Sequence, residues 1–258
     1  MNDREEYIKN GHVTIRNVFD KQEMFYFHQY IKHLIKNLHK KKYFKSSDSY
    51  EKQFTQFLNP WKDDDVLRTI TFNKKLARLA SELSGIDNLR LWQSQLLIKY
   101  PDSNETIAHQ DLPFWPMETD EAISLWFPLN GSTINNGTLY FLPGSHKLGV
   151  KEFTDIVNDK GHNLLMRKPF KQLTPEPILL NSGDISFHHP LTVHLSSKNK
   201  SLEPRIVYSI VYFKDGMKRS KKGKHFIVDE KANYISPGQK IVNNNTPIIY
   251  KKNYTSRL

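Results

Sequence analysis

The feature that most constrains the fold is a change of pattern at Leu89, from which point the chain consists of short β-rich runs. These runs are rich in Val, Ile, Leu, Phe and Tyr and are separated by Pro, Gly, Asn or Ser, which is typical of strands joined by turns. The runs are LRLWQSQLLIKY, AISLWFPL, TLYFLP, EPILLN, DISFHH and RIVYSIVYF. Many short strands at this spacing predict a sandwich, a jelly roll or a barrel.

The first third of the chain predicts helices instead. A turn and a short strand are expected over Asn10–Phe19, and Asp20 stands three residues before a glutamate, which is the spacing of a capping box. Apolar residues then recur at helical spacing, and the cations of Lys40–Lys42 suit the carboxyl end of that helix. A second helix is expected over Asn73–Ser84, with Gly85 as its stop.

Neither an internal repeat nor a long linker divides the chain, so we expect one mainly β (α+β) domain over residues 1–258, with the N-terminal helices packed outside a β-core. The net charge of +11 is concentrated in a basic C-terminal extension at about residues 214–258, which holds eleven Lys and Arg against three Asp and Glu. Its cluster Lys214–Lys224 is either a solvated tail or a contact surface for an anionic partner or substrate.

Other features exclude whole classes of protein. The chain has no cysteine, so it has no disulfide and no thiolate metal site, and any metal must be held by His, Asp or Glu. It has no run of 18 apolar residues, so no membrane span is expected. Its first residues, MNDREEYIKNG, are charged where a signal peptide is apolar, which predicts a cytoplasmic protein.

His109 and Asp111 form an H-x-D pair directly after a strand-like run. Residues i and i+2 of an extended segment point to the same face, so the imidazole and the carboxylate could chelate one ion. The triplet alone equally fits a core histidine beside a surface aspartate. A second histidine would change this interpretation, because two His and one carboxylate are the ligands of non-haem Fe(II) oxygenases. The candidates are His188, His189 and His194.

The neighbours of these three histidines favour His194 as the ligand. Ser196 lies two residues further on the same predicted face, and Arg205, a two-pronged partner for a carboxylate, opens the next strand. His188 and His189 instead precede a proline, which predicts turn or wall residues, either of which could touch substrate.

Three segments resemble the phytanoyl-CoA dioxygenase family of Fe(II)- and 2-oxoglutarate-dependent oxygenases. They are HQD (His109–Asp111), NNGTLYFLPGSHKLG (Asn135–Gly149) and GDISFHHPLTVHLSSKNKSLEPR (Gly183–Arg205), and the likeness runs from about Asn10 to Phe213. The resemblance implies a double-stranded β-helix, a cupin-like jelly roll with iron at one mouth. It also implies a dioxygenase that uses Fe(II), 2-oxoglutarate and O2 to hydroxylate a small molecule, with release of succinate and CO2.

The resemblance assigns roles to individual residues. His109, Asp111 and His194 match the iron ligands, Arg205 the arginine that pairs with the far carboxylate of 2-oxoglutarate, and Ser196 the hydroxyl beside it. Trp126 matches a tryptophan at the co-substrate site, Lys99 a lysine near that site, and Thr138 a position on the strand behind it. The halogenating relatives carry Ala or Gly where this chain has Asp111, so the resemblance implies hydroxylation and not halogenation.

The substrate is the point at which the sequence stops being informative. The stretch Lys147–Glu176 could arch over the mouth of the barrel, where cations such as Arg167 and Lys168 would meet an anionic substrate or stay solvated. Phe114, Trp115 and Phe187 are candidates for the pocket wall, with core packing as the alternative. A nucleic-acid-directed oxygenase or demethylase using the basic cluster, and a non-catalytic β-barrel binding protein, are the two rival functions. No feature of the sequence indicates the oligomeric state.

Overall fold

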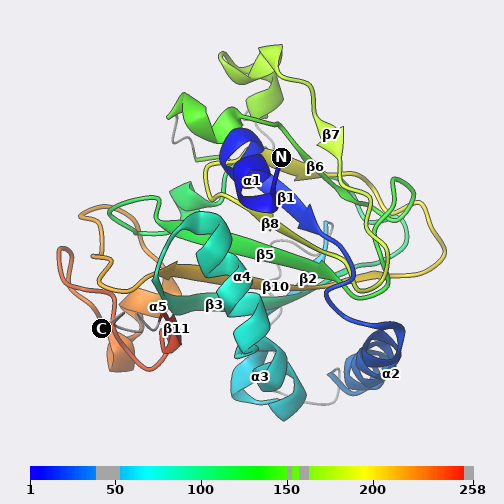
Figure 1. Cartoon of the computed structure of the whole chain (residues 1–258), viewed down its shortest axis with the longest axis horizontal. Coiled ribbons are helices and arrows are strands. Elements are labelled where there is room, and N and C mark those ends of the chain that lie inside the picture. The colour runs from blue at the N-terminus through cyan, green and yellow to red at the C-terminus, as the bar shows by residue number, and fades with distance from the viewer. Residues whose placement is uncertain (39–52, 150–152, 157–162, 253–258) are drawn as a thin grey trace.

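The computed structural model describes residues 1–38, 53–149, 153–156 and 163–252, in which two antiparallel sheets form a jelly roll (Figure 1). The large sheet has the order β1-β8-β5-β10-β3-β11, with β2 also paired to β3, and the small sheet has the order β4-β9-β6-β7. The strands of the two sheets are β1 His12–Ile15, β2 Thr55–Leu58, β3 Asn88–Lys99, β4 Thr106–His109, β5 Ala122–Pro128, β6 Leu139–Phe141, β7 Glu176–Pro177, β8 Ile185–His188, β9 His194–Ser196, β10 Arg205–Lys214 and β11 Ile248–Lys251. The predicted jelly roll is confirmed.

The helices are α1 Asp3–Asn10, α2 Lys21–Leu38, α3 Asp65–Thr71, α4 Lys74–Ser84 and the short α5 Phe226–Asp229. The predicted capping box of α2 is present, since the backbone N–H of Glu23 donates to Asp20 Oδ1 at 2.8 Å and that of Asp20 to Glu23 Oε2 at 2.8 Å. The predicted stop of α4 is also present, because Gly85 adopts the left-handed conformation at φ 76°. The predicted end of α2 at Lys40–Lys42 lies outside the described residues.

The N-terminal helices cover the outer face of the large sheet, as predicted, and α4 crosses that sheet in Figure 1. Leu125 and Phe127 of β5 point outward into the largest apolar cluster, which also contains residues of α2, α3 and α4. Ser124 and Trp126, which alternate with them, point inward toward the small sheet. Because of this alternation, the inner face of the large sheet carries the polar residues that the site uses.

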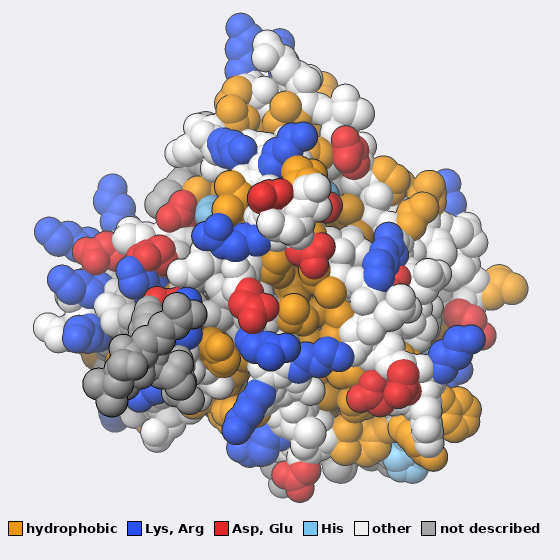
Figure 2. All heavy atoms as spheres, viewed as in Figure 1, with side chains coloured by type: hydrophobic (Ala, Val, Ile, Leu, Met, Phe, Trp, Pro, Cys, Tyr) orange, Lys and Arg blue, Asp and Glu red, His pale blue; other side chains and the backbone are white. Residues whose placement is uncertain are grey.

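The described part of the basic C-terminal extension, residues 214–252, is packed against the core and is not a free solvated tail. Met217, Ile227 and Ile241 are buried in a cluster with Trp92 and Trp115. Ordinary apolar burial thus holds this segment in place. Its lysines at 218, 221, 222 and 224 are exposed, as solvated charges are. On the face of the molecule in Figure 2, Lys and Arg side chains lie among Asp and Glu side chains.

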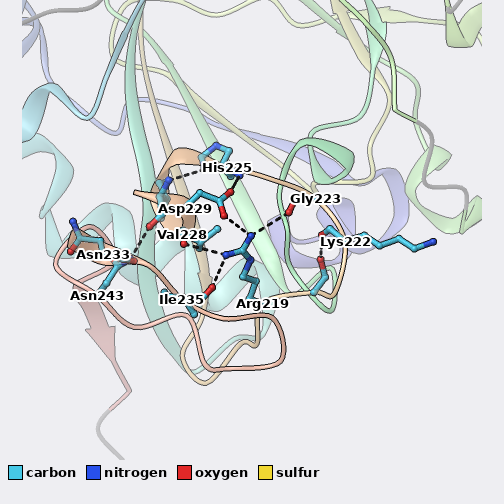
Figure 3. Close-up of polar contacts among 11 residues, drawn as sticks. Arg219, Lys222, Gly223, His225, Val228, Asp229, Asn233, Ile235 and Asn243 are labelled. Atoms are coloured by element: carbon cyan, nitrogen blue, oxygen red, sulfur yellow. Dashed lines mark hydrogen bonds and ion pairs between the residues drawn. The ribbon is translucent and has the colours of Figure 1, made fainter. Parts of the chain in front are cut away.

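One buried arginine holds the turns of this extension together (Figure 3). Arg219 is 5% exposed and donates to the carbonyl oxygens of Val228 at 3.2 Å and Ile235 at 2.6 Å, and to Asp229 Oδ1 at 2.6 Å. A β-bridge joins Arg219 to Met117, two residues beyond Trp115. The extension therefore supports the segment that carries Trp115. None of the described helices is both long and apolar enough to cross a membrane.

Candidate functional site

His109, Asp111 and His194 come together between the two sheets. His109 ends β4 and His194 begins β9, and the two residues are paired in the register of these strands. One ligand atom from each of the three side chains lies within 4.8 Å of the other two, and His194 Nε2 is 3.6 Å from Asp111 Oδ1. Both imidazoles are buried. Two imidazoles and a carboxylate at this separation can hold one divalent cation.

Both imidazoles are oriented by backbone carbonyls. His109 Nδ1 lies 2.8 Å from the oxygen of Ile107, and His194 Nδ1 lies 3.0 Å from the oxygen of Thr192. A carbonyl only accepts, so each Nδ1 carries the hydrogen and each Nε2 keeps its lone pair for a metal. Burial lowers the pKa of His109 below its usual value and, with the charge of His109, lowers that of His194 to about 3. Both rings are thus neutral, as metal ligands must be.

Asp111 reaches this cluster in a way that strand alternation does not explain. The strand β4 ends at His109, and Asp111 has helical dihedrals (φ −74°, ψ −43°). The argument that an extended H-x-D segment places both groups on one face is therefore wrong. The backbone N–H of Asp111 donates to Pro190 O at 3.1 Å, and the chain turns so that the carboxylate returns to the histidines. Burial opposes ionisation, yet the imidazoles of His194 and His188 lower the pKa of Asp111 below its usual value.

Two buried cations lie beside the cluster. Arg205 and Lys99 are register partners on β10 and β3 and are 3% and 0% exposed. Lys99 Nζ donates to Asn104 O at 2.7 Å and to Ser196 Oγ at 3.0 Å. Within the described ranges neither cation has a carboxylate within 4.0 Å. Buried charges are normally paired, so this pair of cations predicts a bound anion.

Arg205 is also fixed by uncharged neighbours. Its guanidinium donates to the carbonyl oxygen of Gly137 and lies 5.3 Å from the centre of the Trp126 ring, in a cation–π contact. Its Nε has no hydrogen-bond partner. Burial lowers the pKa of Arg205 to about 9, which still leaves it charged at neutral pH. The side chain is therefore held ready to meet a carboxylate.

A cavity of about 280 Å³ connects the metal cluster with Arg205. Phe114 and Trp115 line it, together with Ser196, Trp126 and Arg205. Three glutamines that the sequence analysis did not single out, Gln56, Gln93 and Gln95, also line it. Gln93 and Gln95 lie on β3 opposite Val211 and Ser209 of β10. Their spacing of two residues along a strand places both side chains on one face, and this alternation was the feature of the sequence that could have identified them.

Several predicted residues lie elsewhere. Phe187 is fully buried in the cluster on the outer face of the large sheet, so the prediction that it forms the pocket wall is wrong. Thr138 is buried behind the cavity, where its hydroxyl bonds to Ile178 O. Lys99 contacts the cavity only through Ser196.

The predicted arch over the mouth is only partly supported. Arg167 and Lys168 do not line the cavity, because their segment packs through Leu164 and Phe170 onto the outer face of the small sheet. An earlier part of the same stretch does reach the mouth. Ile156 lines the cavity, and the ring of Phe153 lies 4.9 Å from that of Phe114. The remainder of the arch, residues 150–152 and 157–162, lies outside the described ranges.

His188 was predicted to be a turn or a wall residue, and in the structure it lies in the wall of the cavity. Strand β8 continues to His188, which is paired with His12 and Ser124. His188 is 3% exposed, lines the cavity and has its Nε2 3.1 Å from Asp111 Oδ2. His189 points the other way, with its ring 5.3 Å from that of His146.

Comparison with known proteins agrees with this geometry. The family described as phytanoyl-CoA dioxygenase (PhyH) matches residues 7–207. The chain belongs to this family. A phytanoyl-CoA dioxygenase from Arabidopsis thaliana is 33% identical over 162 residues, which cover 61% of this chain and 56% of that protein. A probable alpha-ketoglutarate-dependent hypophosphite dioxygenase from Stutzerimonas stutzeri is 25% identical, covering 76% of this chain and 72% of the relative.

Solved structures of similar proteins support the fold. The epimerase SnoN, solved in complex with Fe3+, alpha ketoglutarate and nogalamycin RO, superposes with a TM-score of 0.79 at 23% identity. The superposition covers 96% of this chain and 97% of SnoN. At this identity, the similarity supports a shared jelly-roll fold and nothing more. The family match ends at residue 207, so most of β10 and the packed C-terminal extension lie beyond it.

Proposed function

We propose that this protein is an Fe(II)- and 2-oxoglutarate-dependent dioxygenase that hydroxylates a small molecule and releases succinate and CO2. The observation that carries the proposal is the pair of buried cations, Arg205 and Lys99, which have no carboxylate within 4.0 Å among the described residues and lie beside the cluster of two histidines and an aspartate. A metal site alone would fit many proteins. A metal site next to a place for a buried anion fits a co-substrate that carries two carboxylates.

The residues would divide the work as follows. Nε2 of His109, Nε2 of His194 and the Asp111 carboxylate would hold the metal, leaving positions open for co-substrate and O2. Bound Fe(II) supplies the activation of O2 and the oxidation of a C–H bond. Arg205 would bind the distal carboxylate of 2-oxoglutarate through charge-assisted hydrogen bonds, with Lys99 beside it. Phe114 and Trp115 would exclude water and position the substrate.

One feature favours hydroxylation over halogenation: Asp111 retains the carboxylate ligand. Epimerisation is the alternative to test, because the superposed neighbour SnoN is an epimerase and an epimerisation adds no oxygen to the product. The test is a screen of a metabolite library by succinate release, followed by mass spectrometry of each active compound. Incorporation of one oxygen atom from O2 supports hydroxylation, and an unchanged product mass would overturn it.

A nucleic-acid oxygenase is the second candidate, and the exposed lysines at 218, 221, 222 and 224 favour it. Such a function requires binding to DNA or RNA that weakens steeply with salt. Retention on heparin that persists at moderate salt and is lost when these lysines are replaced would support it. A non-catalytic binding protein is tested separately, because turnover of 2-oxoglutarate to succinate without added substrate would exclude it.

A further inference from the structure

His188 occupies an unusual position, since it faces the metal cluster without belonging to it. Strand β8 alternates, so Phe187 points to the helices while His188 points into the space between the sheets. Its register partner on the neighbouring strand β5 is Ser124, which points the same way. Two side chains on adjacent strands therefore approach the cluster from the large sheet, whereas His109 and His194 approach it from the small sheet.

Both of these side chains contact the same carboxylate oxygen. His188 Nε2 lies 3.1 Å from Asp111 Oδ2, and Ser124 Oγ donates to Asp111 Oδ2 at 3.0 Å. The other oxygen, Oδ1, is the one 3.6 Å from His194 Nε2. The two oxygens of Asp111 are thus in different environments: one accepts two hydrogen bonds from the large sheet, and the other faces the histidines of the small sheet.

The hydrogen-bond chemistry determines which atom donates. A carboxylate only accepts, so His188 must carry its hydrogen on Nε2. In the neutral ring Nδ1 then has no hydrogen, in agreement with its buried position without a hydrogen-bond partner. A proton on Nδ1 would instead be a buried donor without an acceptor, which is costly. His188 therefore acts as a hydrogen-bond donor to Asp111.

The backbone does not by itself orient the Asp111 carboxylate. Asp111 follows the end of β4, and its helical dihedrals place it in a turn whose N–H bonds to Pro190 O. Rotation about the side-chain bonds would exchange Oδ1 and Oδ2, or present both of them to one ion. A carboxylate that presents both oxygens would take up a coordination position that the co-substrate or O2 needs. Two donors on Oδ2 oppose both movements.

We infer that His188 is a positioning residue: with Ser124 it holds Oδ2 of Asp111, so that Oδ1 alone binds the metal and the remaining coordination positions stay open. This inference rests on the metal site of the proposed function. His188 is not itself a ligand here, since the group of mutually close ligand atoms in the described residues consists of His109, Asp111 and His194.

The test uses the full-length protein and Co(II), whose visible absorption reports coordination number and geometry. His188→Leu removes the donor, whereas His188→Gln places an amide N–H close to where Nε2 lies. The matched control is His12→Leu, because His12 is the register partner of His188 on β1, is also buried and has an Nε2 without a hydrogen-bond partner among the described residues. Circular dichroism and thermal unfolding establish that each variant is folded.

The expected result is a separation between these variants. Loss of a hydrogen bond that orients a metal ligand weakens metal affinity by about 10–100-fold, so His188→Leu should bind Co(II) more weakly by that factor. Its absorption envelope should shift toward a higher coordination number, because Asp111 is free to chelate through both oxygens. His188→Gln should restore affinity and spectrum close to the parent, and His12→Leu should match the parent.

Two results would overturn the inference. Parent-like affinity and spectrum in His188→Leu would mean that this contact does not orient Asp111, and complete loss of Co(II), as in His194→Ala, would mean that His188 is a ligand. If His188→Leu does not fold, Ser124→Ala removes the other donor to Oδ2 and must shift affinity and spectrum in the same direction. A parent that fails to bind Co(II) would refute the proposed function itself, whereas a binding parent with an indifferent His188→Leu refutes only this inference.

Discussion

Replacing Lys99 should stabilise the ligand-free protein while weakening the binding of 2-oxoglutarate. Lys99→Met keeps the length and apolar stem of the side chain but removes a buried charge. Lys99 is fully buried and, among the described residues, bonds only to the neutral acceptors Asn104 O and Ser196 Oγ. If Lys99 stabilised the fold, its replacement would instead lower the free energy of unfolding of the ligand-free protein.

The magnitude follows from the burial of the charge. Burial and, after it, the neighbouring Arg205 lower the pKa of Lys99 from 10.5 to about 7. At about 1.4 kcal/mol per pH unit, the charged form costs the folded state roughly 4–5 kcal/mol. The variant also removes the donor to two acceptors, but Asn104 is exposed to water and Ser196 Oγ keeps its bond to Thr106, so each loss is about 1 kcal/mol. The net expectation is a stabilisation of roughly 2–3 kcal/mol in the ligand-free protein.

The pH dependence has a definite sign. Below about pH 7 Lys99 is charged in both the folded and the unfolded state, so its full cost is present. Between about 7 and 10.5 the unfolded state binds more protons, so the cost falls as pH rises and is gone above 10.5. The stability advantage of Lys99→Met should therefore be largest at and below about pH 7 and should shrink toward pH 10.

The assay is urea unfolding of the ligand-free parent and variant across this pH range, together with calorimetry of 2-oxoglutarate binding to the Zn(II)-loaded forms. Lys214→Met is the control, because Lys214 is an exposed lysine paired with Glu121 at 2.5 Å. It should change neither quantity appreciably. A Lys99→Met protein that is less stable than the parent at neutral pH and binds 2-oxoglutarate equally well would refute the assignment of Lys99 to an anion site.

Three further outcomes are expected. Arg205→Ala should leave metal binding intact but weaken 2-oxoglutarate binding by about 10²–10⁴-fold, since two charge-assisted hydrogen bonds of about 1.5–3 kcal/mol each are lost; unchanged calorimetry would contradict this. His194→Ala should abolish both iron retention and turnover, whereas His189→Ala should keep iron after desalting; the reverse pattern would refute the ligand assignment. Arg219→Ala should lower the free energy of unfolding by about 3–5 kcal/mol, because the carboxylate and carbonyls around it lose a buried partner, while exposed Lys214→Ala should cost under about 1 kcal/mol.

The sequence was most informative where a local pattern determines the structure. The β-rich composition of RIVYSIVYF predicted β10, and the capping spacing at Asp20 predicted the start of α2. Helix α1 also has a capping box, formed by Asn2 and Glu5, but its eight residues lack the apolar stripe on which the prediction of helices relied. Strand β2 is four residues long and exists through its pairing with β3, a contact that no local pattern reveals.

The site was predicted through its residues and not through its geometry. The neighbours of His194 and the resemblance to the family singled out the three side chains that cluster in the structure, although Asp111 reaches the histidines from a turn and not along a strand. Phe187 was predicted to line the pocket but points outward, whereas His188, predicted to be a turn or a wall residue, lies in the wall because β8 continues to it. Which face of β8 points inward depends on its pairing with β1 and β5, and that register is a property of the folded protein.

The measurement that tests the central claim most directly is an anaerobic absorption titration of the Fe(II)-loaded protein with 2-oxoglutarate. The two buried cations and the three-ligand cluster predict that 2-oxoglutarate binds to the metal, which produces a weak visible metal-to-ligand charge-transfer band that saturates at one equivalent. The same titration of Arg205→Ala should require far more 2-oxoglutarate to reach that band. Absence of any band in the parent, with no heat of 2-oxoglutarate binding, would contradict the account.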